Sequence, residues 1–136
     1  MRAVLVAAGL LLATQGSVAF GCGHCAEDKV AATYDHGIVT RAAKRGHAMV
    51  FSEVVGIERA EHGWAPALVA VLEAVPGVDR GTVRLSAAPP AVSFSMDSDG
   101  YAIDDAIRTI NRKLANRKLA LTVLQVVDAR KTAARK

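Results

Sequence analysis

The chain is poor in aromatic residues and cysteines, and its excess of positive charge is small. Aromatic residues make up 4% of the 136 residues, only two cysteines occur, and the formal net charge is +4. Nucleic-acid-binding proteins usually gather more positive charge on one face and carry aromatic side chains that stack on bases. We therefore expect no nucleic acid among its partners. The basic residues gather near the C-terminus, where we interpret them as a solvated helix face and, over residues 129–136, a basic tail.

Patterns that would indicate a catalytic or calcium site are also missing. No Ser-His-Asp arrangement and no glycine-rich phosphate loop stands out. The turn from Asp97 to Gly100 does not have the glycine spacing of an EF-hand loop, so we assign its aspartates to turn and capping roles. Because 51% of the residues are hydrophobic and 22% are charged, a packed domain is nevertheless expected. The sequence therefore favours a folded protein that is not an enzyme.

The N-terminus has the pattern of a secretory signal peptide over residues 1–19. Arg2 precedes an apolar run of about eleven residues, which is too short to span a bilayer comfortably. Small residues at Ser17 and Ala19 predict cleavage after Ala19. We expect a secreted or periplasmic protein with no stable membrane insertion after cleavage. An uncleaved anchor and lipidation at Cys22 are the alternatives.

The two cysteines form the motif Cys22-Gly23-His24-Cys25, close behind the leader. A disulfide between them would close a very short loop and so stabilise little, although an exported pair tends to oxidise. Acidic residues follow the motif and a helical pattern begins at Ala26, so the pair is expected at a helix N-terminus. Unsatisfied backbone N–H groups there favour the thiolate, which is both a nucleophile and a metal ligand. The sequence therefore predicts chemistry at residues 20–46, if the chain has any.

Two thiolates with this spacing suit Cu(I), or supply half of a tetrahedral Zn(II) site. We predict Cys22 and Cys25 as metal ligands with His24 as a third ligand or neighbour, Cu(I) being favoured over Zn(II). Zinc would need two more ligands. Besides His24, the candidates are His36, His47, His62 and the new amino terminus at Phe20. For the first three of these, surface or capping roles are the more ordinary interpretation.

The elements after the motif predict an α+β domain over residues 47–128. Residues 26–45 read as one helix whose apolar stripe is Val30, Tyr34 and Ile38, ending at Gly46. Strand and helix patterns then alternate over residues 48–56, 64–75, 82–86, 92–96, 103–114 and 119–127. The order βαββαβ is that of a ferredoxin-like antiparallel sheet with an extra N-terminal helix. That helix should dock at an edge of the sheet or on its open face.

Two strands carry alternating side chains. In residues 92–96, apolar side chains alternate with Ser93 and Ser95, which predicts a half-buried strand. The last strand should place its odd-numbered residues from Leu119 to Val127 on one face.

Several short segments of this domain resemble the heavy-metal-associated domain of copper chaperones and P-type ATPases. They are Val55-Gly56-Ile57, Val75-Pro76-Gly77-Val78, Val83-Arg84-Leu85, Val92-Ser93-Phe94 and Ile103 with Ala106-Ile107, within residues 48–111. The resemblance implies a ferredoxin-like fold and trafficking of soft metals. The family has a Cys-x-x-Cys between its first strand and first helix, whereas the corresponding positions here lie near Glu61 and Trp64. The motif at Cys22 and Cys25 is displaced to the N-terminal helix.

Two further functions remain open. Cys-Gly-His-Cys is also the active-site tetrapeptide of disulfide isomerases, but only Phe20 and Gly21 of the mature chain would precede it, too few for the strand that a thioredoxin-like fold requires there. A thiol-disulfide protein of another fold is one alternative. The other is a non-catalytic module whose sheet face or edge binds another envelope protein. For a metal-binding protein, the expected partner is a metal-transport or envelope protein.

Overall fold

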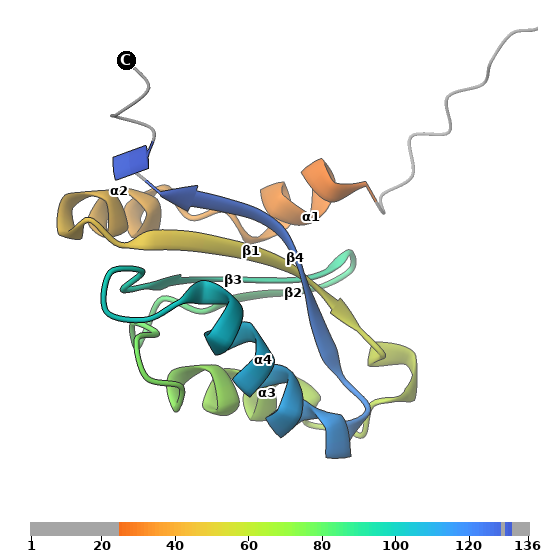
Figure 1. Ribbon diagram of the computed structural model, residues 1–136. Helices are drawn as coiled ribbons and strands as arrows, with labels where there is room; N and C mark the ends of the chain where they lie inside the picture. Colours follow the sequence, from red (N-terminus) through yellow and green to blue (C-terminus); the bar gives the residue numbers. More distant parts are fainter. Residues whose placement is uncertain (1–24, 129, 132–136) are drawn as a thin grey trace, which may run out of the picture.

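The computed structural model describes residues 25–128, 130 and 131, and the predicted leader, Cys22 and His24 lie outside this part. The described chain is an α+β fold built on one four-stranded antiparallel sheet, ordered β2-β3-β1-β4 (Figure 1). The strands are β1 (Ala48–Val55), β2 (Arg84–Ala87), β3 (Pro90–Met96) and β4 (Ala120–Asp128). Together with the helices between them they give the βαββαβ order of a ferredoxin-like fold. The predicted fold class is confirmed.

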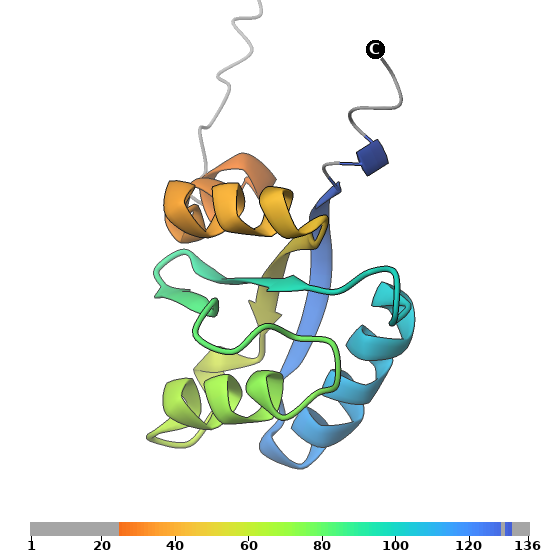
Figure 2. The same ribbon diagram turned by 90° about the vertical axis from the view of Figure 1, so that its left-hand side faces the viewer.

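Helices α3 (Trp64–Glu73) and α4 (Ile103–Leu114) cover one face of the sheet (Figures 1 and 2). The predicted apolar stripes of both helices face it: Leu68, Leu72, Ile110 and Leu114 are fully buried. They pack with Val50, Val54 and Phe94 of the central strands in the larger hydrophobic core. Short 3₁₀ helices, η1 (Ile57–Arg59) and η2 (Ala115–Arg117), lie in the loops after β1 and α4.

Helices α1 (Ala26–Thr33) and α2 (His36–Arg45) cover the opposite face (Figure 2). A smaller core lies beneath them, formed by Ile38 and Ala42 of α2 and Met49 and Phe51 of β1. The predicted N-terminal helix therefore docks on the face that would otherwise be open. Gly46 closes α2 with a left-handed backbone (φ 69°) and donates its N–H to α2 carbonyls, as expected of a C-cap.

The prediction of a single helix over residues 26–45 is wrong, because the chain breaks at Tyr34 and Asp35. Both residues have extended backbone angles, and the Asp35 carboxylate accepts a 3.1 Å hydrogen bond from the N–H of Ile38. This contact caps a second helix, and capping by a short acidic side chain competes with continuing the first. The break turns Tyr34 outward, 53% exposed, so it does not belong to the predicted apolar stripe.

Strand β3 is buried on both faces, which corrects the prediction of a half-buried strand. Ser93 and Ser95 are 0% and 2% exposed because α1 and α2 lie over them. Each hydroxyl has a partner: Ser93 Oγ donates to the carbonyl of Thr33 at 2.7 Å, and Ser95 Oγ to the carboxylate of Asp79 at 2.6 Å. The hydrogen bonds offset the cost of burying these polar groups.

The prediction that the odd-numbered residues of the last strand, from Leu119 to Val127, all lie on one face is also wrong. Its pairing with β1 shifts at a bulge, since Ser52 faces Val123 while the neighbouring Phe51 faces Gln125. An extra residue in one strand reverses the side-chain alternation beyond it. Leu121 accordingly lies in the larger core, whereas Val127 packs against the smaller core on the other side of the sheet.

Candidate functional site

Cys25 is the one member of the predicted metal site that the structure describes. It is exposed and free, and it is the N-cap residue of α1 with extended backbone angles. Its carbonyl accepts the first helical hydrogen bond, from the N–H of Lys29 at 3.2 Å. The predicted placement of this thiol at a helix N-terminus is therefore confirmed. Cys22 and His24 lie outside the described residues.

Helix α1 is held on the sheet by polar side chains and by Val30, which packs against the smaller core. Its buried residues are Lys29 and Thr33, which are 6% and 3% exposed. The Nζ of Lys29 lies 2.7 Å from Oε1 of Glu53 in β1, and the carbonyl of Thr33 accepts the bond from Ser93 of β3. These two contacts fix both turns of α1, and so fix the position of Cys25 relative to the sheet.

The histidines considered as further zinc ligands lie on different elements. His36 is exposed at the start of α2, and His62 is exposed in the loop before α3. His47 is half-buried at the start of β1, at the opposite end of that strand from His62. Within residues 25–128, 130 and 131, no three histidine, cysteine or acidic side chains are grouped as a metal site would require.

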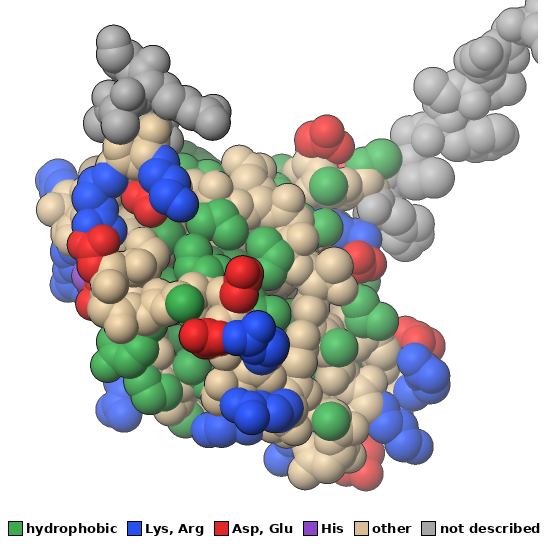
Figure 3. All heavy atoms as spheres, in the orientation of Figure 1, with side chains coloured by type: hydrophobic (Ala, Val, Ile, Leu, Met, Phe, Trp, Pro, Cys, Tyr) green, Lys and Arg blue, Asp and Glu red, His purple; other side chains and the backbone are tan. Residues whose placement is uncertain are grey.

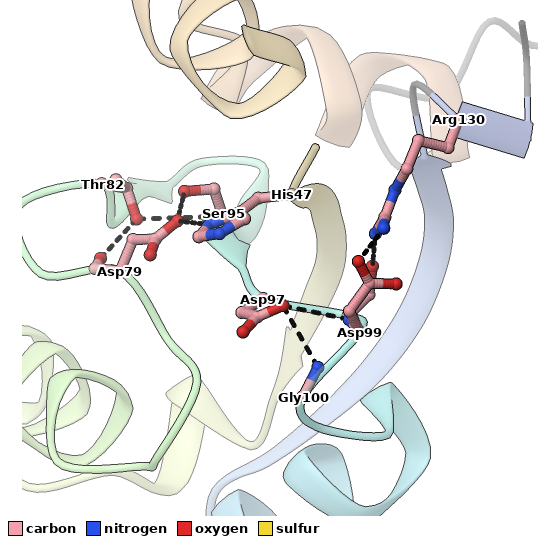
Figure 4. A network of polar contacts seen from close by, with 9 residues as sticks. His47, Asp79, Thr82, Ser95, Asp97, Asp99, Gly100 and Arg130 are labelled. Atoms are coloured by element: carbon pink, nitrogen blue, oxygen red, sulfur yellow. Dashed lines mark hydrogen bonds and ion pairs between the residues drawn. The ribbon is translucent and has the colours of Figure 1, made fainter. Parts of the chain in front are cut away.

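His47 belongs to a polar network centred on Asp79 (Figure 4). The Asp79 carboxylate is 2.8 Å from Nδ1 of His47 and accepts the Ser95 hydroxyl at 2.6 Å. The carbonyl of Asp79 accepts the Thr82 hydroxyl at 2.6 Å, and Thr82 Oγ1 in turn accepts the N–H of Ser95. The Ser95 hydroxyl therefore bonds to the carboxylate that also contacts His47, and not to the imidazole itself. The network fastens the loop before β2 to β1 and β3.

A second network in Figure 4 fastens the loop after β3. The Asp97 carboxylate accepts the N–H groups of Asp99 and Gly100, as predicted for a turn aspartate. Arg130, from the predicted basic tail, forms an ion pair with Asp99. The described start of the tail is thus tied to the domain.

The residues that the predicted family resemblance places near the missing metal motif, Glu61 and Trp64, line a cavity. The cavity measures about 250 Å³ and lies between the loop after β1 and the loop after α4. Arg59, His62, Arg117 and Lys118 also line it. Lys and Arg side chains, with acidic ones beside them, gather over this end of the molecule at the lower right of Figure 3. This cavity could not be predicted from the sequence, because its basic residues come from segments more than fifty residues apart.

The two loops that border the cavity meet at Gly56. This glycine has a left-handed backbone (φ 97°), and a Cβ added to it would lie 2.1 Å from the carbonyl oxygen of Lys118. Only glycine permits so close an approach. Lys118 is itself left-handed (φ 59°), the only such non-glycine residue in the described chain. The cavity is therefore bordered by fixed backbone on both sides.

Comparison of the chain with models of protein families, with curated proteins and with solved structures finds no match. Its function has therefore to be inferred from its own residues. Among the described residues, no helix is both long and apolar enough to cross a membrane.

Proposed function

We propose that the protein binds a soft metal ion, Cu(I) in the first instance, through the thiolates of Cys22 and Cys25 after export to the periplasm or the cell exterior. The observation that carries the proposal is the exposed, free thiol of Cys25 at the N-cap of α1. A thiol buried among apolar side chains would favour an inert structural role instead.

The position of α1 also supports metal transfer by ligand exchange. The Lys29–Glu53 pair and the Thr33–Ser93 hydrogen bond hold the helix on the sheet, so its first turn presents Cys25 to solvent from a fixed support. A partner's thiolates can reach a metal bound there without unfolding the domain. His24 is the third ligand or a neighbour that hydrogen-bonds to the site.

The ferredoxin-like fold adds a second, weaker line of support. Heavy-metal-associated domains share this fold, and the short segments quoted above resemble them. In this chain the family's metal loop lacks thiols, so we assign the metal to the N-terminal motif and regard the sheet domain as its scaffold.

A Cu(I) titration of the reduced chain beginning at Phe20, in competition with a chelator and without oxygen, tests the proposal. The wild type should bind one equivalent, and Cys22→Ser, Cys25→Ser should bind none. His36→Ala is the matched control, because this exposed histidine lies on a different helix, and its affinity should equal that of the wild type. Weaker binding by His24→Ala would identify His24 as a ligand.

Absence of competitive binding by the wild type would refute the copper proposal. A zinc titration and the reduction potential of the cysteine pair would then separate the alternatives. A pair that exchanges readily with glutathione would favour a thiol-disulfide protein, since an exposed thiol meets the first requirement for exchange. Inertness in all three assays would leave an interaction module that binds another envelope protein.

A further inference from the structure

We propose that the cavity bordered by η1 and η2 is a binding site for a small, doubly charged oxyanion, of which phosphate is the simplest. The cavity measures about 250 Å³, and its fixed charges are the cations of Arg59, Arg117 and Lys118 against the carboxylate of Glu61. Among these four lining side chains, the positive charges exceed the negative ones by two, which matches the charge of a dianion. The proposed metal site uses none of these residues.

The cations are available to a ligand. Arg117 and Lys118 form no ion pair with any residue that the structure describes. Arg59 Nε lies 3.4 Å from Glu58 Oε1, and both side chains are about two thirds exposed or more. An ion pair this exposed to solvent is weak, so it competes poorly with a bound anion. Arginine and lysine donate charge-assisted hydrogen bonds to phosphate oxygens, and arginine can donate two at once.

The same charges disfavour a metal ion in this cavity, which is the ligand that the resemblance to heavy-metal-associated domains would otherwise suggest. A metal cation in this cavity would meet three fixed positive charges and one carboxylate, with a single imidazole from His62 as a neutral ligand. That set repels a cation and supplies no thiolate. His62 and Trp64 also line the cavity, and both side chains carry ring N–H groups that can donate hydrogen bonds to an acceptor-rich ligand.

The site is held open by its backbone, so little ordering is needed on binding. Gly56 lies against the carbonyl of Lys118, and the N–H of Arg59 bonds to the carbonyl of Gly56 at 3.0 Å. On the opposite border, Asn111 of α4 accepts from the N–H and donates to the carbonyl of Leu121, at 2.8 and 3.1 Å. Both loops that carry the cations are therefore tied to the sheet.

Trp64 makes the test direct, because it is the only tryptophan in the chain and it lines the cavity. Titration with inorganic phosphate at constant ionic strength should change its fluorescence saturably, and sodium chloride should not. Amide chemical shifts over residues 57–64 and 115–118, measured in the same titration, report binding if the indole itself is not perturbed. Acetate, which carries one charge, should bind more weakly than phosphate at a pH where phosphate is mostly the dianion.

Lys118→Gly is the decisive variant. Glycine adopts the left-handed backbone at this position more readily than lysine, so the variant should be at least as resistant to urea as the wild type while it loses one cation. Its phosphate affinity should fall about tenfold, the usual loss when one charge-assisted hydrogen bond is removed. Arg112→Gln, an exposed cation of α4 outside the cavity, should leave the affinity unchanged.

Three results would overturn the proposal. The first is no saturable response in either fluorescence or chemical shift. The second is an equal loss of affinity in Arg112→Gln and Lys118→Gly, which would indicate attraction to the basic surface as a whole. The third is equal affinity for acetate and phosphate, which would remove the assignment to a dianion. None of these outcomes bears on Cu(I) binding at the N-terminal motif.

Discussion

The Lys29–Glu53 ion pair should respond very differently to removal of its two members. The side chain of Lys29 is 7% exposed and that of Glu53 is 32% exposed, with Nζ and Oε1 separated by 2.7 Å. Glu53→Gln leaves a buried ammonium group without its counter-charge, although the new amide oxygen still accepts a hydrogen bond. Lys29→Met leaves a carboxylate that water can reach and places an unbranched apolar side chain in the buried position.

The magnitudes follow from these exposures. Breaking a fully buried pair costs about 3–5 kcal/mol, and breaking a fully exposed one costs about 0–1 kcal/mol. Because Lys29 is close to the first limit, we expect Glu53→Gln to lower the free energy of unfolding by about 2–3 kcal/mol. For Lys29→Met we expect a loss of about 1 kcal/mol or less, since methionine has a helix propensity similar to that of lysine. The double variant should resemble Lys29→Met and be more stable than Glu53→Gln.

Urea denaturation followed by circular dichroism measures the global effect. Amide hydrogen exchange in α1 measures the local one, since this helix of eight residues can leave the sheet before the domain unfolds. A cost for Lys29→Met equal to or greater than that for Glu53→Gln would refute the argument from burial. So would a double variant less stable than either single one.

Three other substitutions test separate features of the fold. Gly56→Ala should destabilise the protein by at least about 2 kcal/mol in urea denaturation, because the added methyl group would clash with the carbonyl of Lys118 at a positive φ; wild-type stability would contradict the close approach of the two loops. Ser52→Ala should stabilise it by about 1 kcal/mol in the same assay, since the buried Ser52 hydroxyl has no partner among the described residues. The hydrogen bond from the N–H of Ile38, and secondarily the Arg84 side chain, lower the pKa of Asp35 below its ordinary value of 3.8. The ionised carboxylate therefore stabilises the fold above that pH, and this contribution is lost as the pH falls below it. The stability difference between wild type and Asp35→Asn should therefore be full at neutral pH and shrink in acid, and a difference independent of pH would contradict this.

Much of the fold could be predicted because its strands and helices follow simple periodicities. The stripes that include Leu68, Leu72, Ile110 and Leu114 indicated α3 and α4, and all four side chains are fully buried. The βαββαβ order then determined a ferredoxin-like sheet. These features depend on local patterns of apolar residues, which a sequence displays directly.

The N-terminal helices show where such patterns fail. The fully buried residues of α1 are a lysine and a threonine, and burial of a lysine depends on a carboxylate 24 residues away in β1. The break before α2 depends on a single capping contact of Asp35. Ser93 and Ser95 looked solvent-facing for the same reason, since their partners, Thr33 and Asp79, are distant in sequence. Polar burial is set by tertiary contacts that periodicity does not contain.

The two candidate sites, the N-terminal thiol site and the basic cavity, differ in the ligands that their side chains can bind. In heavy-metal-associated domains, the family to which a resemblance is proposed from the sequence, metal binds in the loop between the first strand and the first helix of the sheet domain. Here the same loop borders a cavity with three fixed cations, and Gly56 holds it against the loop that supplies two of them. A metal ion is disfavoured there by charge as well as by the absence of thiols. Cys25 lies at the start of a helix on the opposite face of the sheet, away from these cations (Figures 1 and 2). Cys25 of the proposed metal site and the proposed anion cavity therefore lie at separate positions of one small fold, and we expect a substitution in one to leave binding at the other unchanged.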